Sequence, residues 1–322
     1  MQYATVVSAL LIVGAIAVGL LAARMGPPAA APRATADAVP LPSPPPDTGP
    51  LVFRQPFAAG CATADAVWVV ADGGGIGRFD GERWHLIDPT LRSLAAAACR
   101  TDVMVAVGPA GRIVTIDDVA RTVRVDTATI EDLLSVAVFG AGAMAVGSRG
   151  TVMIEGPDGW SVYARGIEED LLAVAAFGRL EAWAVGAGGS AYRLEEAGWR
   201  PVATGVTEVL RAIVGSAIGD VVAAGDGGTL LRYDGSWKSV PSGVTVTLRA
   251  AARVGGVTYV AGDRGTVLAL EGATVRRADL PTTCTVRAAF ARGADVWFVG
   301  SEGTRGGVWR RTGDRLVQWG EC

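Results

Sequence analysis

The most restrictive feature of this 322-residue sequence is a short motif that occurs seven times. In each copy an apolar stretch leads into a tight turn that ends on glycine, as in VVAAGDGGTL from Val221 and TYVAGDRGTV from Thr258. The turn glycines are Gly74, Gly111, Gly150, Gly189, Gly228, Gly265 and Gly303. They follow one another at spacings of 37, 39, 39, 39, 37 and 38 residues. Regular spacing of this kind indicates one structural unit repeated along the chain.

Each unit has room for four short strands. The first is rich in Leu, Ala and Val, as in LLSVAVF from Leu133, and the second is the apolar stretch before the turn. A third strand follows the turn, and the fourth often begins with tryptophan, as at Trp237. Four strands in about 38 residues is the size of one propeller blade. We therefore predict an all-β fold, a seven-bladed β-propeller over residues 51–322.

An aromatic residue recurs at one position of the second strand. The second strand carries an aromatic residue in four of the units, at Trp68, Trp183, Tyr259 and Trp297. We interpret this position as packing between neighbouring blades. The inner strands are rich in alanine, which suits strands that converge on a central axis.

The residues before the repeats form two segments of different composition. Residues 4–23 contain no charged side chain, and twenty residues of helix can cross a hydrocarbon core of ~30 Å. We predict a helix within residues 1–25 that is either a retained membrane anchor or a signal peptide cleaved near residues 29–31. The length of the apolar run favours the anchor. Either reading predicts a cell-envelope protein, periplasmic or extracellular, that is tethered to the inner membrane or secreted.

Residues 26–50 hold nine of the 16 prolines in the chain. Proline favours the extended polyproline II conformation and removes backbone donors. We predict a semi-rigid linker between the N-terminal segment and the propeller.

The repeats resemble those of a known group of proteins. LRAIVGSAIGDVVAAGDGGTLLRYDGSW, residues 210–237, looks like a repeat of exported bacterial propellers of the BNR/Asp-box-like and photosystem II assembly factor-like type, within the wider WD40/YVTN/BNR-like class. It is also similar to tectonin-type lectin repeats. The resemblance extends over residues 57–319 and implies a non-catalytic protein-binding or scaffold function. Its expected partner is another protein or an exposed peptide segment.

Four cysteines in an exported chain permit disulfide bonds. Cys61 and Cys99 are 38 residues apart, and so are Cys284 and Cys322. Because one repeat separates the members of each pair, each bond is expected to link neighbouring blades. The second bond would also fix the last residue to the ring. Free buried thiols are the alternative for both pairs.

Charged residues suggest a binding surface at one end of the ring. The loops that lead into the inner strands and the turns after the second strands should share one face. Arg211, Arg249 and Arg287 occupy the same repeat position in three consecutive units, and guanidinium groups bind carboxylates and phosphates through two hydrogen bonds. Loops of two preceding units carry acidic residues, which are Glu131, Asp132, Glu168, Glu169 and Asp170.

Three interpretations of the arginines are open. They bind an anionic ligand or an acidic partner segment, they form structural ion pairs with carboxylates of neighbouring blades such as Asp220 and Asp295, or they are solvated surface residues. Asp72, Asp226 and Asp263 recur at the turn, where we expect them to cap the turn.

Composition and motifs exclude several functions. A net charge of −3 without a basic block argues against nucleic-acid binding. The chain has a single histidine, His85, no CxxC motif and no catalytic or phosphate-binding motif, so we predict no metal site, cofactor or catalytic residue.

Two alternatives to a protein-binding scaffold stay open. A carbohydrate-binding, lectin-like propeller would need exposed tryptophans, and the candidates are Trp84, Trp160, Trp199 and Trp237. A glycoside hydrolase-like enzyme would need two convergent carboxylates, one with a raised pKa. The candidates for those carboxylates are Glu131, Asp132 and Glu169.

Overall fold

The computed structural model describes residues 34–35, 37–41, 54, 56–72, 75–88, 93–164, 166–320 and 322. The predicted helix within residues 1–25, the cleavage region at 29–31, much of the linker and Gly74 lie outside these residues. In the part of the chain that the structure describes, no helix is both long and apolar enough to cross a membrane.

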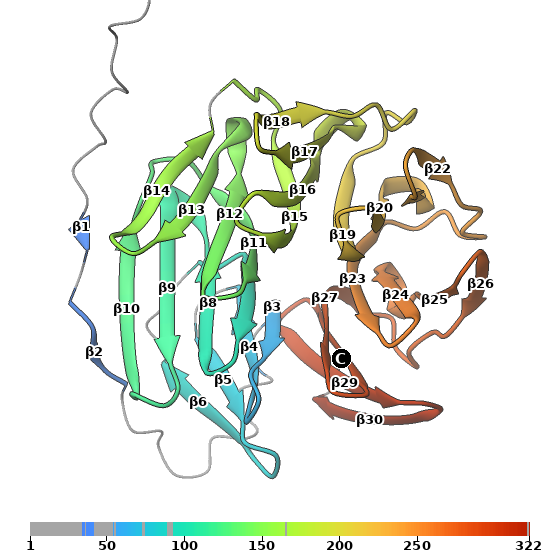
Figure 1. Ribbon diagram of the computed structural model, residues 1–322. Helices are drawn as coiled ribbons and strands as arrows, with labels where there is room; N and C mark the ends of the chain where they lie inside the picture. The colour runs from blue at the N-terminus through green and yellow to red at the C-terminus, as the bar shows by residue number, and fades with distance from the viewer. Residues whose placement is uncertain are drawn as a thin grey trace, which may run out of the picture. The chain divides into compact units, whose positions relative to one another are not determined.

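The described strands form seven antiparallel sheets, each built on four strands consecutive in the sequence, which confirms the predicted propeller (Figure 1). Blades 1 and 2 contain β3 (Phe57–Ala62), β4 (Val67–Ala71), β5 (Ile76–Phe79), β6 (Trp84–Asp88), β7 (Ala96–Arg100), β8 (Val103–Val107), β9 (Arg112–Asp117) and β10 (Thr122–Thr127). Blades 3 and 4 contain β11 (Leu133–Phe139), β12 (Gly142–Gly147), β13 (Val152–Gly156), β14 (Gly159–Ala164), β15 (Leu171–Gly178), β16 (Glu181–Gly186), β17 (Ala191–Glu195) and β18 (Gly198–Pro201).

The remaining three blades repeat the same order. Blades 5 and 6 contain β19 (Leu210–Ala217), β20 (Asp220–Gly225), β21 (Leu230–Tyr233), β22 (Trp237–Ser239), β23 (Leu248–Val254), β24 (Val257–Gly262), β25 (Val267–Glu271) and β26 (Thr274–Arg277). Blade 7 contains β27 (Thr285–Arg292), β28 (Asp295–Glu302), β29 (Arg305–Thr312) and β30 (Arg315–Gly320).

In the part of the chain that the structure describes, the ring closes without exchange of strands between blades. The first strand of each blade contacts the first strand of the next, and β27 contacts β3. Aromatic side chains seal the seam between blades 7 and 1. Trp319 stacks on Trp297 with ring centroids 5.3 Å apart, and Phe79 of blade 1 lies 5.3 Å from Trp319. Side-chain packing therefore closes the ring.

The second-strand tryptophans pack between blades, as predicted. Trp68 and Trp183 are fully buried, and each belongs to an apolar cluster that includes residues of the following blade. An arginine of the third strand covers each ring, with Arg78 5.6 Å from Trp68 and Arg193 5.9 Å from Trp183. The packing therefore includes cation–π contacts as well as burial.

Two glycines hold the turn after the second strand close to the loops around it. In blade 5, η4 (Asp226–Gly228) is a short 3-10 turn in which Gly228 has φ 74°. A Cβ at Gly228 would lie 2.0 Å from the carbonyl oxygen of Val244, in the loop leading to blade 6. A Cβ at Gly225 would lie 2.0 Å from the oxygen of Val209. The repeated glycines are therefore needed for close backbone contact as well as for φ.

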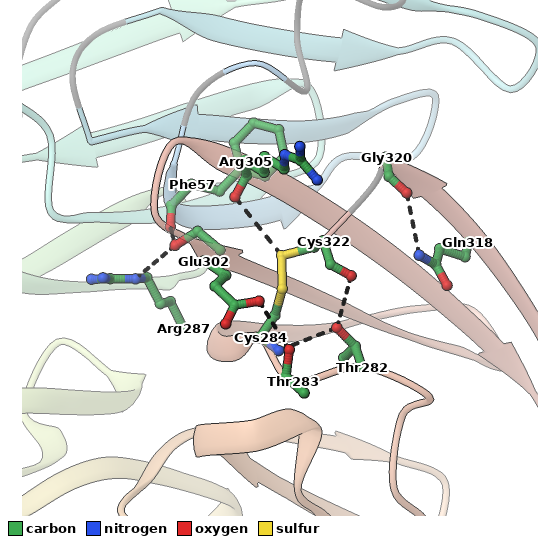
Figure 2. Close-up of a disulfide and its surroundings, with 11 residues drawn as sticks. Phe57, Thr282, Thr283, Cys284, Arg287, Glu302, Arg305, Gln318, Gly320 and Cys322 are labelled. Atoms are coloured by element: carbon green, nitrogen blue, oxygen red, sulfur yellow. Dashed lines mark hydrogen bonds between the residues drawn. A yellow bond between two sulfur atoms is a disulfide. The ribbon is translucent and has the colours of Figure 1, made fainter.

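Both predicted disulfides are present. Cys61 in β3 bonds to Cys99 in β7, which joins blades 1 and 2 as expected. Cys284 bonds to Cys322 and fixes the last residue (Figure 2). The prediction that this second bond joins two blades is wrong, because Cys284 precedes the first strand of blade 7 and Cys322 follows its last strand. Thr282, in the same loop, donates a hydrogen bond to the Cys322 carbonyl oxygen (3.1 Å).

Two short strands from the segment predicted as linker pair with blade 2. β1 (Ala34–Thr35) and β2 (Val39–Pro40) run antiparallel to β10 along the outer edge of the blade (Figure 1). Part of the proline-rich segment therefore lies on the propeller, and it covers an edge strand that would otherwise expose unpaired backbone groups.

Candidate functional site

A cavity of about 520 Å³ lies at the axis of the ring, and the first strands of all seven blades line it. One repeat position contributes only small side chains to its wall. These are Ala59, Ala96, Ser135, Ala173, Ala212, Ala250 and Ala288. The alanine-rich inner strands thus leave the centre of the ring open.

The three repeat arginines also line this cavity. Each is the second or third residue of its inner strand, next to the turn that follows the second strand. We call this end of the ring the arginine face. It carries the loops that lead into the inner strands and the turns after the second strands, as predicted, and the other end is the opposite face.

In blades 5 and 6 each arginine forms an ion pair with an aspartate of its own blade. We call such an arginine closed, and one without a carboxylate partner open. Arg211 Nε and Nη2 donate to Asp226 at 2.5 and 2.9 Å, and Arg249 donates in the same way to Asp263 at 2.7 and 3.3 Å. About one third of the Arg211 and Asp226 side chains is exposed. The hydrogen bond from Arg211 lowers the pKa of Asp226 and raises that of Arg211, so both groups stay charged near neutral pH.

The prediction that these arginines form structural ion pairs is correct for blades 5 and 6. The prediction that their partners are Asp220 and Asp295 of neighbouring blades is wrong. Asp220 binds Arg253 at 2.8 Å, and Asp295 accepts a hydrogen bond from Thr312 at 2.5 Å. The strand register explains the difference. Leu210 pairs with Gly225, so Arg211 lies beside the turn after β20, whereas Asp220 is the residue at the other end of β20. Asp226 and Asp263 therefore hold arginines, a role that the turn-capping prediction missed.

Blade 7 departs from this arrangement. Ser301 stands where blades 5 and 6 have aspartate, and Arg287 Nε donates to its hydroxyl oxygen at 3.0 Å. Arg287 is exposed, and within the described residues no carboxylate lies within 4.0 Å of its guanidinium. Figure 2 shows this side chain near the Cys284–Cys322 bond. Arg287 is thus a cation at the cavity wall whose charge the described protein atoms leave unpaired.

Blade 1 has the complementary departure. It carries Asp72 at the turn but Ala58 at the arginine position, and both residues line the cavity. Among the described residues, Asp72 forms no ion pair. The seam between blades 7 and 1 therefore places one open cation and one open carboxylate on the same cavity wall.

The predicted acidic residues are mostly engaged in local structure. Asp132 accepts a hydrogen bond from the backbone N–H of Ala110, and Asp170 accepts one from Arg149, both at 2.9 Å. Both donors have positive φ, 53° and 51°, so each carboxylate stabilises a strained turn of the preceding blade. Glu131 forms an ion pair with the Arg149 guanidinium, with Nε to Oε2 at 2.8 Å.

Glu168 and Glu169 lie in the loop that leads into blade 4, and Glu168 is exposed. The hydroxyl of Tyr192 donates to Glu169 at 2.6 Å and lowers the pKa of that carboxyl. Burial, followed by the contact with Glu169, raises the pKa of Tyr192 to about 12. A hydrolase acid needs a raised carboxyl pKa, and Glu169 has the opposite shift. No group of three or more potential metal ligands occurs in the described ranges.

The tryptophans proposed for carbohydrate binding divide into two pairs. Trp84 and Trp160 are buried, with 5% and 4% of their surfaces exposed, so neither offers a stacking platform. Trp199 and Trp237 are half-buried. Trp199 lines a separate cavity of about 640 Å³ together with Tyr163 and Tyr192.

Ser301 and Thr285 were not among the residues predicted from the sequence. Thr285 precedes β27's apolar residues and donates to Asp263 at 3.2 Å, which links blade 7 to blade 6. A sequence signal for Ser301 was present, because the turn residues of blades 5, 6 and 7 align as Asp, Asp and Ser. The missing step was the strand register that pairs each turn residue with the arginine of its own blade.

Comparisons with known proteins agree with the geometry. No protein-family model matches the sequence, and no curated protein matches it. Among solved structures, the WD40 repeats of RRP9 match with a TM-score of 0.67 and 11% identity, covering 78% of this chain and 89% of that one. YCF48 bound to D1 peptide gives 0.64 and 14% identity, covering 83% and 94%. Sqt1 of Saccharomyces cerevisiae gives 0.60 and 10%, covering 82% and 85%. At these identities the likeness establishes the fold, and the chain is a seven-bladed β-propeller.

Proposed function

We propose that this protein is a non-catalytic binding propeller, displayed outside the cytoplasmic membrane, that holds a peptide segment of a partner protein at its arginine face. The observation that carries the proposal is Arg287, an exposed cation on the wall of the axial cavity. Its position is defined by a rigid inner strand, and its charge is available to a ligand.

The arrangement favours an acidic group as the anchor of the bound segment. Arg211 and Arg249 already use two nitrogens each on an aspartate, so a ligand carboxylate would have to displace that partner. Arg287 uses only Nε, on a neutral hydroxyl, and in the described residues its two terminal nitrogens form no hydrogen bond. A carboxylate can therefore form charge-assisted hydrogen bonds with Arg287 at little cost.

The size of the cavity favours a segment over a whole domain. A volume of about 520 Å³ holds a few side chains, and its alanine walls leave room for backbone close to the axis. The rest of the partner would lie across the loops of the arginine face. Loops held by a rigid scaffold are the usual place for such contacts.

The comparisons support a protein or peptide as the ligand. WD40 repeats share the fold, and one neighbour, YCF48, was solved with a peptide bound. These similarities add weight to the proposal, which depends on the open arginine of this chain.

Peptide binding by the full-length protein in detergent tests the proposal. An array of decapeptides that each carry one Asp or Glu is compared with twins that carry Asn or Gln, and the strongest binders are measured by fluorescence anisotropy. Acidic peptides should bind more tightly than their amide twins, and Arg287→Ala should weaken them about tenfold, as expected for loss of a charged hydrogen bond.

The matched control is Arg292→Ala. Arg292 ends the strand in which Arg287 lies, and it donates to the Ala64 carbonyl oxygen on the opposite face. Its removal should leave peptide affinity unchanged. Equal binding of acidic and amide peptides, or an Arg287→Ala protein with native affinity, would overturn the proposal.

A further inference from the structure

One repeat position forms a ring at the mouth of the axial cavity, on the arginine face. In six blades it is the extra residue of a β-bulge, because the register between the first and second strands shifts across it. Bulges often redirect a side chain toward a functional site. We call the seven residues at this position, all of which line the cavity, the mouth ring. They are Ala58, Ala95, Leu134, Leu172, Arg211, Arg249 and Arg287.

The mouth ring is divided by polarity. Blades 5, 6 and 7 contribute its arginines, blades 3 and 4 its leucines, and blades 1 and 2 its alanines. The first strands contact one another in sequence order around the ring. Two blades therefore separate blade 7 from blade 4 in one direction, and two separate it from blade 3 in the other. The leucines thus lie across the cavity from Arg287.

Leu134 and Leu172 are not part of the packed core. Both are half-buried, and neither belongs to any of the apolar clusters that the described residues form. The residues before them, Leu133 and Leu171, are fully buried instead. The fold does not require leucine at the mouth ring, since blades 1 and 2 have alanine there. Two large apolar side chains at the mouth of the cavity are therefore available to a ligand.

Carboxylates around the mouth favour one orientation of an acidic ligand. Glu168 is exposed in the loop that leads to Leu172, and Asp72 lines the cavity in blade 1. Both carboxylates repel an acidic group of the ligand, whereas Arg287 attracts it. The acidic group is therefore directed to blade 7, which leaves the wall of blades 3 and 4 to an uncharged side chain.

The size of the cavity favours an extended segment. An α-helix with its side chains is ~10–12 Å wide, so two turns of helix would need more than the cavity's volume of about 520 Å³. In an extended segment, successive side chains point to opposite sides. A segment that enters the mouth along the axis therefore presents one side chain to blade 7 and the next side chain to blades 3 and 4.

We infer that the bound segment carries an acidic residue and a large apolar residue at adjacent positions, and that Leu134 and Leu172 bind the apolar side chain while Arg287 binds the acid. The inference rests on the proposed function, which supplies the acid at Arg287. The mouth ring then recognises two chemical properties of one short sequence, and its leucines are the residues that determine specificity for the apolar side chain.

Peptides with a defined pair of residues test the inference. Decapeptides of Gly and Ser carry Asp-Leu at their centre, and three twins carry Asp-Ala, Asn-Leu or Asp-Gly-Leu. Their affinities for the full-length protein in detergent are measured by fluorescence anisotropy. Asp-Leu should bind about tenfold more tightly than Asp-Ala, because its leucine side chain leaves water. Asp-Gly-Leu should lose most of that gain, since its two side chains point to the same side.

Protein variants identify the residues that bind the apolar side chain. Leu134→Ala combined with Leu172→Ala should weaken the binding of Asp-Leu about tenfold and leave that of Asp-Ala unchanged. An unchanged unfolding midpoint shows that this double variant is folded. The matched control is Leu180→Ala. Leu180 also belongs to blade 4, but it lies in the turn between β15 and β16 on the opposite face, where it is 43% exposed.

Equal binding of Asp-Leu and Asp-Ala, or native affinity of the double variant for Asp-Leu, would overturn the inference. An Asp-Gly-Leu peptide that binds as tightly as Asp-Leu would overturn the adjacent arrangement. None of these results removes the preference for Asp over Asn, so the proposed function would stand. Equal binding of Asp-Leu and Asn-Leu would instead reject the proposed function, and the inference with it.

Discussion

Blades 5 and 6 differ from blade 7 at the arginine face, although the three share one strand plan. In blades 5 and 6 a tight 3-10 turn follows the second strand and presents an aspartate to the arginine. In blade 7, β28 and β29 extend further and meet in a hairpin turn at Gly303, and Ser301 replaces the aspartate. The strand arrangement is thus the same in all three blades, and the residue at the turn, aspartate or serine, decides whether the arginine has a carboxylate partner.

The glycines of the two kinds of turn should respond very differently to substitution, and this is the largest effect that we expect. Gly228→Ala puts a Cβ at φ 74° and 2.0 Å from the Val244 oxygen, which should lower the free energy of unfolding by about 3 kcal/mol or more. Gly303→Ala meets no atom within 4 Å and has only its φ of 58° to oppose it, which costs about 1 kcal/mol. Chemical denaturation measures both, and equal losses would contradict the difference between the turns.

Giving Arg287 of blade 7 a carboxylate partner should weaken the proposed peptide binding without changing the fold. Ser301→Asp gives Arg287 the partner that Arg211 and Arg249 have, so acidic peptides should bind about tenfold more weakly, as after loss of a charged contact. Ser301→Asn is the matched control because it adds a side chain of the same size without charge. Native affinity in Ser301→Asp, with an unchanged unfolding midpoint, would show that Arg287 is not the anchor.

The opposite experiment removes the aspartate partner of Arg249 in blade 6. Asp263→Ser reproduces the blade 7 pair at Arg249, and acidic peptides should then bind a few-fold more tightly because a second guanidinium is free. The gain should be smaller than the loss in Ser301→Asp, since Thr285 also loses its partner and the loop beside blade 7 is loosened. Isothermal titration of the same peptides gives the comparison, and a loss of affinity would speak against a shared ligand for the two arginines.

The smallest expected effect is the acid dependence of the closed pair. Arg211 holds the pKa of Asp226 below its ordinary value of 3.8, so the carboxylate stabilises the fold above that pH and the contribution disappears as pH falls through the lowered pKa. An exposed pair of this kind contributes less than about 1 kcal/mol. The midpoint temperature of thermal unfolding should therefore fall more steeply between pH 5 and pH 2 in the native protein than in Asp226→Asn. Parallel curves would mean that the ion pair adds nothing.

The sequence predicted the ring because its evidence is local and repeated. Seven glycine-containing turns at nearly constant spacing fix the number of units, and the spacing of the cysteines identified both bonded pairs. The inter-blade position of the tryptophans also followed from their place in the repeat. Each of these features can be recognised by aligning the chain with itself.

The repeat pattern predicted only part of the candidate site. The arginine position was clear, but its partners were assigned to Asp220 and Asp295 because sequence alone does not give the register between β19 and β20. The pairing of β1 and β2 with β10 was missed because it joins segments some 85 residues apart through backbone groups that any residue supplies.

The amino-acid sequence by itself determined a seven-unit all-β ring with an alanine-lined centre and three arginines in register. The reason is that local turn chemistry and side-chain size repeat in every unit. Only the tertiary structure decided that Arg211 and Arg249 are paired with aspartates while Arg287 is not, and that β1 and β2 pair with the outer strand of blade 2. Those outcomes depend on strand register and on contacts between distant segments, which arise only when the chain is folded.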